Sequence, residues 1–285
     1  MTPAPSVLNP PPSRLSRFGR PRVMGILNIT SDSFYEHSRV PSAEAAVRRG
    51  LRMEAEGADI LDVGGESTRP GSDPVSVEEE CRRVLPVVEA LAKKVKIPVS
   101  IDTSKAEVAE RAFDHGASIL NDVTALRGDP RMGEAALRYP VVLLMHMLGT
   151  PKMMQEDPRY SDVVAEVAAF FRERLSAFSA RGGDAGKVWL DPGIGFGKTL
   201  EHNLEILSRL EELRALGRPL VLGASRKSFI GGVLGEPGRP LPAQERLPGS
   251  LAAACRAAEA GAYAVRVHDV KETREALDVY ARMRP

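Results

Sequence analysis

The chain has 285 residues, of which 43% are hydrophobic and 27% are charged, an ordinary composition for a globular protein. Its 39 basic and 38 acidic residues leave a net charge of +1. No overall attraction to nucleic acid or to an anionic membrane surface is therefore expected, and no apolar run reaches membrane-spanning length. We predict that neither nucleic acid nor membrane is a partner.

The first 20 residues are rich in proline and lack the apolar stretch of a secretion signal. We predict a flexible tail over residues 1–20 and one folded domain over 21–285. The two cysteines, Cys81 and Cys255, fall in helical patterns and have no metal-ligand spacing. We interpret both as small buried hydrophobic residues in a reducing compartment, the cytoplasm.

A short apolar run, a polar turn and an amphipathic helical stretch recur along the rest of the chain. The predicted strands span residues 23–29, 59–64, 98–103, 118–123, 141–147, 188–193, 219–225 and 263–269. The helical patterns between and after them include residues 42–56, 75–94, 162–180, 200–216 and 271–283. Apolar strands that alternate with helices indicate parallel pairing.

Eight such units, with no spare element at either end, favour an α/β fold of the (β/α)8 TIM-barrel type in a single domain. The alternative is a doubly wound open sheet. The segment 231–249 is rich in glycine and proline, and we predict a long loop there before the seventh helix.

In a barrel of this kind, the carboxyl ends of all strands face one mouth. The polar residues at or just after the predicted strand ends are Asn28, the turn 64–69, Asp102, Asn121, His146, Asp191, Ser225, Arg226, Lys227, Arg266 and His268. Carboxylates, amides and a lysine together suit a flat heterocycle with many donors and acceptors. Arg69, Arg266 and His268 suit a phosphorylated group.

Several of these residues also have a structural interpretation. Asp102 could cap the following helix, although Thr103 and Ser104 are equally good caps. His146 lies in a very apolar strand, where a satisfied core histidine is as plausible as a functional one. Glu66 suits either an interior salt bridge or an active-site role.

The stretch 191–199 ends in Gly-Lys-Thr, like a phosphate-binding P-loop. That motif needs a glycine where Pro192 stands. We therefore interpret the glycines of this stretch as positions where the backbone lies close to a ligand.

Long motifs in separate loops resemble those of dihydropteroate synthases, in the order of that family. They include VMGILNITSDSF (23–34), DVGGESTRPG (62–71), DPGIGFGK (191–198) and GASRKSFIG (223–231). The resemblance runs from Val23 to the C-terminus. It implies a (β/α)8 pterin-binding catalytic domain and a transferase of folate biosynthesis. Such an enzyme joins 6-hydroxymethyl-7,8-dihydropterin pyrophosphate to 4-aminobenzoate and releases pyrophosphate.

The resemblance also implies Mg2+ as cofactor, sulfonamides as competitors of 4-aminobenzoate, and a homodimer. It assigns pterin binding to Asp102, Asn121, Asp191, Lys227 and Arg266, of which all but Asn121 are expected to be catalytic. It assigns pyrophosphate binding to Asn28, Arg69, Arg266 and His268, with Asn28 also the metal ligand. It assigns 4-aminobenzoate binding to Thr68, Pro70, Phe196, Ser225 and Lys227.

The sequence departs from the family pattern in the first loop, at residues 35–38. Two glycines usual in that family are absent, and Glu36 stands where aspartate is usual. We hypothesise a stiffer lid there, because glycine supplies backbone freedom. Two other functions are compatible with a pterin site: methyl transfer from methyltetrahydrofolate to a corrinoid protein, and pterin binding without catalysis.

Overall fold

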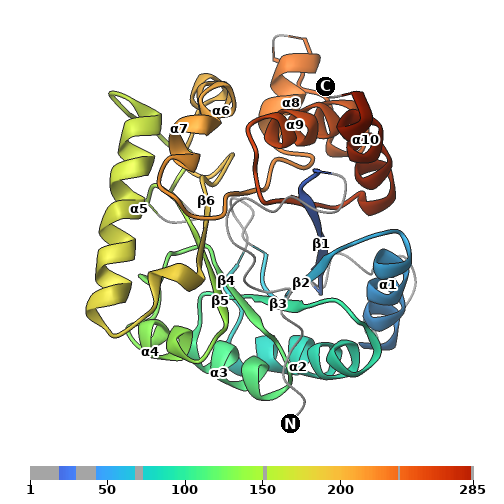
Figure 1. Ribbon diagram of the computed structural model, residues 1–285, viewed down its shortest axis with the longest axis vertical. Coiled ribbons are helices and arrows are strands. Elements are labelled where there is room, and N and C mark those ends of the chain that lie inside the picture. Colours follow the sequence, from blue (N-terminus) through green and yellow to red (C-terminus); the bar gives the residue numbers. More distant parts are fainter. Residues whose placement is uncertain (1–18, 30–42, 68–72, 150–152, 237, 284–285) are drawn as a thin grey trace.

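Helices surround a ring of parallel strands in the computed structural model of this protein (Figure 1). The structure describes residues 19–29, 43–67, 73–149, 153–236 and 238–283. The strands are β1 (Arg22–Asn28), β2 (Ile60–Gly64), β3 (Val99–Asp102), β4 (Ile119–Asp122), β5 (Val141–Met145), β6 (Val188–Asp191), β7 (Val221–Leu222) and β8 (Ala264–Val267). Each one lies within a predicted strand or extends it by one residue, so all the strand predictions are confirmed.

The sheet closes on itself. Its strand order is β6-β5-β4-β3-β2-β1-β8-β7, and every pairing is parallel. A bridge between Leu190 and Leu220 joins the two end strands, and the Leu190 N–H donates to the Pro219 carbonyl at 2.9 Å. The predicted TIM barrel is therefore confirmed, and the open-sheet alternative is wrong.

The helices are α1 (Ala43–Ala55), α2 (Val77–Lys94), α3 (Ala106–Asp114), α4 (Met132–Leu137), α5 (Val163–Ala180), α6 (Leu200–Ser208), α7 (Leu210–Arg214), α8 (Ser228–Leu234), α9 (Leu247–Glu259) and α10 (Val270–Met283). Polar caps begin several of them. Ser76 accepts the Glu79 N–H at α2, and Asp162 accepts two N–H groups at α5. Such caps satisfy amide groups that have no partner inside the helix.

Two predictions of helix extent need correction. The helix predicted over 200–216 is interrupted at Arg209, whose φ of −115° ends α6 and begins α7. The loop predicted over 231–249 is shorter than expected, because α8 continues to Leu234 and α9 begins at Leu247. Burial of Phe229 and Ile230 in α8 offsets the low helix propensity of the glycines that follow them.

The amino-terminal half of the barrel interior is filled by apolar side chains that point inward from the strands: Met24, Ile60, Ile119, Val141, Leu143, Trp189, Val221 and Ala264. Side chains alternate across a strand, so the residue two positions further along points inward again, nearer the carboxyl end. That residue is Asp62 after Ile60, Asn121 after Ile119 and Asp191 after Trp189. The strand period thus places polar groups directly above a closed apolar floor.

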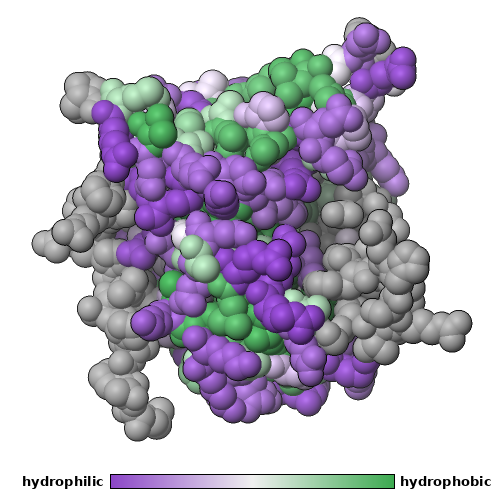
Figure 2. All heavy atoms as spheres, turned by 90° about the vertical axis from the view of Figure 1, so that its right-hand side faces the viewer, coloured by the Kyte–Doolittle hydropathy of each residue, from purple (hydrophilic) through white to green (hydrophobic). Residues whose placement is uncertain are grey.

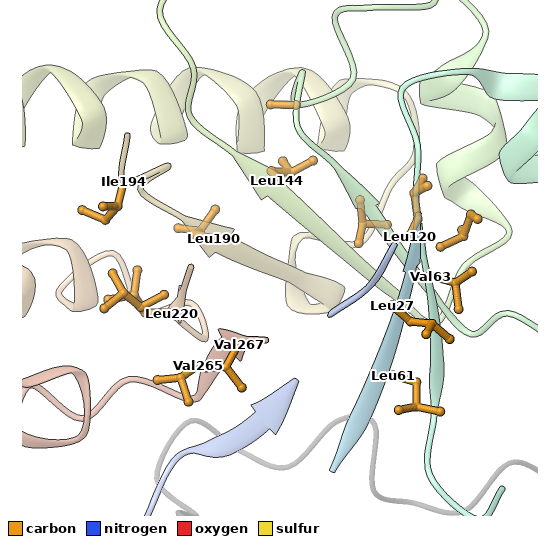
Figure 3. Packing of buried hydrophobic residues seen from close by; sticks show 14 of the residues in the cluster. Leu27, Leu61, Val63, Leu120, Leu144, Leu190, Ile194, Leu220, Val265 and Val267 are labelled. Atoms are coloured by element: carbon orange, nitrogen blue, oxygen red, sulfur yellow. The ribbon is translucent and has the colours of Figure 1, made fainter. Parts of the chain in front are cut away.

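The outward-facing strand residues pack against the helices and form the larger core. Figure 3 shows Leu27, Leu61, Val63 and their neighbours in this layer, where all the labelled side chains are buried. Burial stabilises the fold by about 1.5–3 kcal/mol for each side chain of this size. This core holds the strands, and therefore their carboxyl ends, in fixed relative positions.

Residues 1–18 of the predicted tail lie outside the described residues. Arg20, near the end of that predicted tail, is only 3% exposed. It forms ion pairs with Asp59 at 3.1 Å and with Asp278 of α10 at 2.9 Å. The chain is thus held against the amino-terminal end of the barrel before β1 begins.

The face that carries α1, α9 and α10 is covered mostly by hydrophilic side chains, with apolar ones gathered in its upper part and in a second group below its middle (Figure 2). No helix in the described ranges is long and apolar enough to cross a membrane. Cys81 is buried in α2, as predicted, and Cys255 is half-buried in α9.

Candidate active site

A cavity of about 330 Å3, counted out to its open mouth, lies at the carboxyl end of the barrel. Its walls are formed by Asp102, Asn121, Val123, Met145, Asp191, Gly193, Phe196, Gly223, Lys227 and Arg266. All the residues predicted to bind the pterin are in this set, together with Phe196. The structure therefore brings together, in one pocket, residues that are up to 164 positions apart in the chain.

Side chains from four strands meet in a buried network of ion pairs and a hydrogen bond in the wall of the cavity. Arg266 of β8 donates from Nε to Asp62 Oδ2 and from an Nη to Asp102 Oδ2, both at 2.6 Å. Asn121 donates from Nδ2 to the same Asp62 oxygen at 3.1 Å. Asp62 is completely buried, and the sequence analysis did not include it among the site residues. It holds two site side chains at once.

Burial dominates the electrostatics of the two cavity carboxylates. It raises the pKa of Asp102 to about 7, although the charge of Arg266 acts in the opposite direction. Burial also raises the pKa of Asp191, against the Gly193 N–H and the charges of Lys227 and Arg266. Each carboxylate is therefore poorly solvated and interacts strongly with a positive or hydrogen-bonding ligand group.

Glycines give the Asp191 carboxylate its position and its space. Its Oδ1 accepts the Gly193 N–H at 2.8 Å. Gly193 has a φ of 67°, and a Cβ there would lie 1.9 Å from the His146 carbonyl oxygen. A Cβ on Gly223 would lie 3.3 Å from Asp191 Oδ2. Gly193 thus allows the backbone of this loop to approach a neighbouring strand end closely, while the predicted close approach of residues 191–199 to a ligand stays a prediction.

Lys227 extends over an aromatic ring, with Nζ 4.0 Å from the centre of the Phe196 ring. The preceding residue, Arg226, has a φ of 57°, which is uncommon for a residue with a side chain. Its guanidinium forms an ion pair with Asp269, and its N–H donates to Ser250 Oγ at 2.9 Å. These contacts hold the turn that directs Lys227 into the cavity.

Ser225 and His268 contact each other and are not among the residues that line the cavity. Ser225 Oγ lies 3.1 Å from His268 Nδ1 and accepts the His268 N–H at 3.2 Å. Burial, followed by the nearby charge of Arg266, lowers the pKa of His268 to about 3. The imidazole is neutral at physiological pH, so it can bind an anion only as a hydrogen-bond donor.

Asn28 ends β1 beside this network. A Cβ on Gly64 would lie 3.6 Å from both Asn28 Oδ1 and Asp102 Oδ2, so Gly64 leaves these two oxygens room at the barrel mouth. Oxygen ligands of this kind suit Mg2+, which commonly takes one or two protein ligands and completes its shell with water and phosphate. The described residues contain no group of three or more histidine, cysteine or acidic side chains that could hold a metal ion. The side-chain oxygen of Asn28 at the barrel mouth is a ligand atom of the kind that Mg2+ takes.

The remaining predicted contacts cannot be placed. Thr68, Arg69, Pro70 and the first loop, including residues 35–38, lie outside the described residues.

Three residues with two possible interpretations now have defined contacts. Asp102 pairs with Arg266 and does not cap α3, whose N-cap residue is Lys105. Glu66 forms a salt bridge with Lys105 at 2.8 Å, and Lys105 also pairs with the buried Glu80 at 2.6 Å. His146 is buried, and its Nδ1 lies 2.9 Å from Lys198 Nζ. Lys198, Lys105 and Glu80 were not predicted as site-supporting residues.

Comparison with known proteins identifies the family. Residues 24–268 match the family model described as "Pterin binding enzyme". The dihydropteroate synthase of Escherichia coli K12 is 49% identical over 259 residues, which cover 91% of this chain and 90% of that protein. The chain belongs to the dihydropteroate synthase family.

Solved structures agree with this assignment. A Yersinia pestis dihydropteroate synthase in complex with a sulfonamide drug is 44% identical, with a TM-score of 0.87 over 95% of this chain and 96% of that one. A Xanthomonas albilineans dihydropteroate synthase with 4-aminobenzoic acid is 46% identical, with a TM-score of 0.85 over 94% of this chain and 95% of that one. The enzyme is a transferase of this family, and the predicted reaction class is confirmed.

Proposed function

We propose that the cavity at the barrel mouth binds 6-hydroxymethyl-7,8-dihydropterin pyrophosphate and 4-aminobenzoate, joins them into 7,8-dihydropteroate and releases pyrophosphate. The observation that carries this proposal is the convergence of Asp102, Asn121, Asp191, Lys227 and Arg266 on one pocket above an apolar floor. A flat, polar heterocycle fits such a pocket because polar side chains surround its edge while the floor excludes water.

The donor and acceptor pattern suits the edge of a pterin. Asn121 gives one N–H to Asp62, which leaves Oδ1 to accept from a ligand. Asp102 and Asp191 present carboxylate oxygens, and the adjacent N–H groups of a pterin can donate to a carboxylate in pairs. Lys227 can donate to the pterin 4-oxo group. We therefore assign the pterin ring to these residues together with Arg266.

The aryl substrate is assigned to the side of the cavity where Phe196 and Lys227 meet. The Phe196 ring offers an apolar face for a benzene ring, and Lys227 Nζ borders it. Thr68, Pro70 and Ser225 complete this assignment from the family resemblance. Ser225 would act through its contact with His268, because it does not line the cavity.

The pyrophosphate is assigned to Arg266, His268, Asn28 and Arg69, as the family resemblance implies. We propose Asn28 as the ligand of Mg2+, which when bound would neutralise negative charge on the pyrophosphate. If C–O cleavage precedes attack, positive charge develops on the pterin methylene carbon. The fixed carboxylates of Asp102 and Asp191 would stabilise that charge, and the neutral aryl amine would then attack.

The test is the incorporation of labelled 4-aminobenzoate into dihydropteroate by the purified protein, with and without EDTA. Lys227→Ala should lower kcat/KM by about 30- to 1,000-fold, because a charged hydrogen bond in a buried site contributes about 2–4 kcal/mol. Lys94→Ala, an exposed position at the end of α2, is the matched control and should leave turnover unchanged.

Three results would contradict the proposal. Tight pterin binding without turnover would support a pterin-binding protein without catalysis. The altered first loop would then be the first segment to test as the cause of the lost turnover. Near-unchanged kinetic constants for Lys227→Ala would refute the place of that residue in the site. Methyl transfer that depends on a corrinoid protein would indicate the other pterin chemistry.

The homodimer stays a prediction, and sedimentation velocity measurements would test it.

A further inference from the structure

Phe196 lies in the loop between β6 and α6, in which three glycines have positive φ angles. Gly193, Gly195 and Gly197 have φ angles of 67°, 82° and 65°. These angles are readily adopted only by glycine, and glycine backbones have the most conformational freedom. The backbone of this loop therefore does not by itself fix the position of Phe196, and other contacts must hold it.

Three polar side chains hold carbonyl groups of this loop between Gly195 and Gly197. Gln155 Nε2 donates to the Gly195 carbonyl at 2.5 Å. Lys198 Nζ donates to the Phe196 carbonyl at 3.0 Å. The Tyr160 hydroxyl donates to the Gly197 carbonyl at 2.8 Å. The lysine contact is the one that bears directly on Phe196.

Lys198 is a costly residue in its position. It is only 3% exposed, and no salt bridge found among the described residues includes it. Burial lowers the pKa of Lys198 to about 7, which reflects this cost. A methionine would fill similar space without a polar group to satisfy, so packing alone does not account for a lysine here.

His146 is matched to this lysine. Burial, followed by the charge of Lys198, lowers the pKa of His146 to about 2, so the ring is neutral and Nδ1 can accept a hydrogen bond from Nζ. The ring packs edge-on against Phe170 at 4.8 Å between centres. The backbone N–H of His146 donates to the backbone carbonyl of Asp191 at 2.9 Å. The histidine thus ties Lys198 to the rigid end of β5.

We propose that Lys198 and His146 are positioning residues that fix Phe196 and thereby set the affinity for the arylamine substrate. The chain of contacts runs from His146 through Lys198 to the Phe196 carbonyl, and from the Phe196 ring to the cavity beneath Lys227. This inference rests on the proposed function, in which the arylamine lies against Phe196. Neither residue lines the cavity, so neither is expected to contact substrate.

The first test compares Lys198→Met with wild type, through steady-state kinetics and through calorimetric Kd values for 4-aminobenzoate in the presence of pterin, pyrophosphate and Mg2+. The KM and Kd for 4-aminobenzoate should rise by about tenfold or more, while kcat and the KM for the pterin substrate change by less than about threefold. Lys187→Met, a half-buried lysine before β6, is the matched control and should change none of these.

A double-mutant cycle separates positioning from general destabilisation. In a Phe196→Ala background, Lys198→Met should cause no further rise in the KM for 4-aminobenzoate, because the ring that it positions is gone. A further rise equal to that seen in the wild-type background would overturn the inference. An unchanged KM and Kd for Lys198→Met would also overturn the inference. If the wild-type enzyme turns over normally, that outcome leaves the proposed function intact.

A second pair of variants tests the histidine and serves if Lys198→Met fails to fold. His146→Leu removes the acceptor and should reproduce the rise in KM for 4-aminobenzoate. His146→Asn offers an Oδ1 in place of Nδ1 and should recover most of the loss. Equal constants for the leucine and asparagine variants would refute the role assigned to the hydrogen bond. Without wild-type turnover the proposed function fails, and the Kd values then decide the inference alone.

Discussion

Asp62→Asn offers the sharpest test of how the barrel positions its pterin site. The carboxylate of Asp62 is completely buried and accepts from Arg266 at 2.6 Å and from Asn121 at 3.1 Å. The asparagine variant keeps the size of the side chain and one acceptor oxygen but loses the negative charge. Arg266 would then have one carboxylate, Asp102, in place of two, and its Nε would donate to a neutral acceptor in place of a charged one.

The expected loss follows from the bonds that change. A hydrogen bond to a charged group contributes about 1.5–3 kcal/mol, and each 1.4 kcal/mol corresponds to about a tenfold change. We therefore expect kcat/KM for the pterin substrate to fall by about 10- to 150-fold. The KM for 4-aminobenzoate should change little, because Asp62 holds none of the residues assigned to the aryl substrate.

The assay is initial-rate turnover with the pterin pyrophosphate varied at saturating 4-aminobenzoate. Asp59→Asn is the matched control, because Asp59 also pairs with a buried arginine, Arg20, but directly before β2, at the opposite end of that strand. That control should lower the melting temperature and leave kcat/KM unchanged. If Asp62→Asn keeps kcat/KM within about threefold of wild type, the network does not position the site and our reasoning is wrong.

Three further predictions follow from the same contacts. With the pKa of Asp102 at about 7, kcat/KM for the pterin should fall about tenfold between pH 8 and pH 6, because protonation removes an acceptor; a flat profile over that range would contradict this. Gly193→Ala should greatly lower both the melting temperature and pterin affinity, because its Cβ would lie 1.9 Å from a carbonyl oxygen; wild-type values for both would refute the strained geometry. Lys105→Met should lower the free energy of unfolding in urea by about 3–5 kcal/mol, because Glu80 would be left buried and unpaired. Adding Glu80→Gln to that variant should restore most of the lost stability.

The sequence predicts the barrel and most of its polar rim because both depend on local periodicity. Strands show the period of two, helices show the longer period, and strand ends lie at one mouth whatever the detailed packing. The interruption of the helix at Arg209 has no such periodic signal, and that arginine pairs with Asp162, the N-cap residue of α5. Composition also misled the prediction for residues 231–249, where burial of neighbouring apolar side chains outweighed glycine propensity.

Asp62 was missed because the sequence analysis examined strand ends and not strand interiors. The signal was present in DILDVG, where an aspartate stands within an otherwise apolar run of a buried strand. A charge in that position must be paired, since an isolated buried carboxylate is very unfavourable. Its partner, however, lies 204 residues away on β8, and no local pattern could have identified it.

The charges of the cavity explain how one site could hold a neutral ring and release an anion. Asp102 and Asp191 line the cavity proposed for the pterin, the buried Asp62 pairs with Arg266, and Arg266 and Lys227 are the cations among the lining residues. In a poorly solvated pocket these carboxylates attract a developing methylene cation and repel the departing pyrophosphate. Groups other than these carboxylates must then hold the anion, which agrees with the proposed assignment of its contacts to Arg266, His268, Asn28 and Arg69. The residues that bind the ring would therefore also favour separation of the two charged fragments, before the aryl amine attacks.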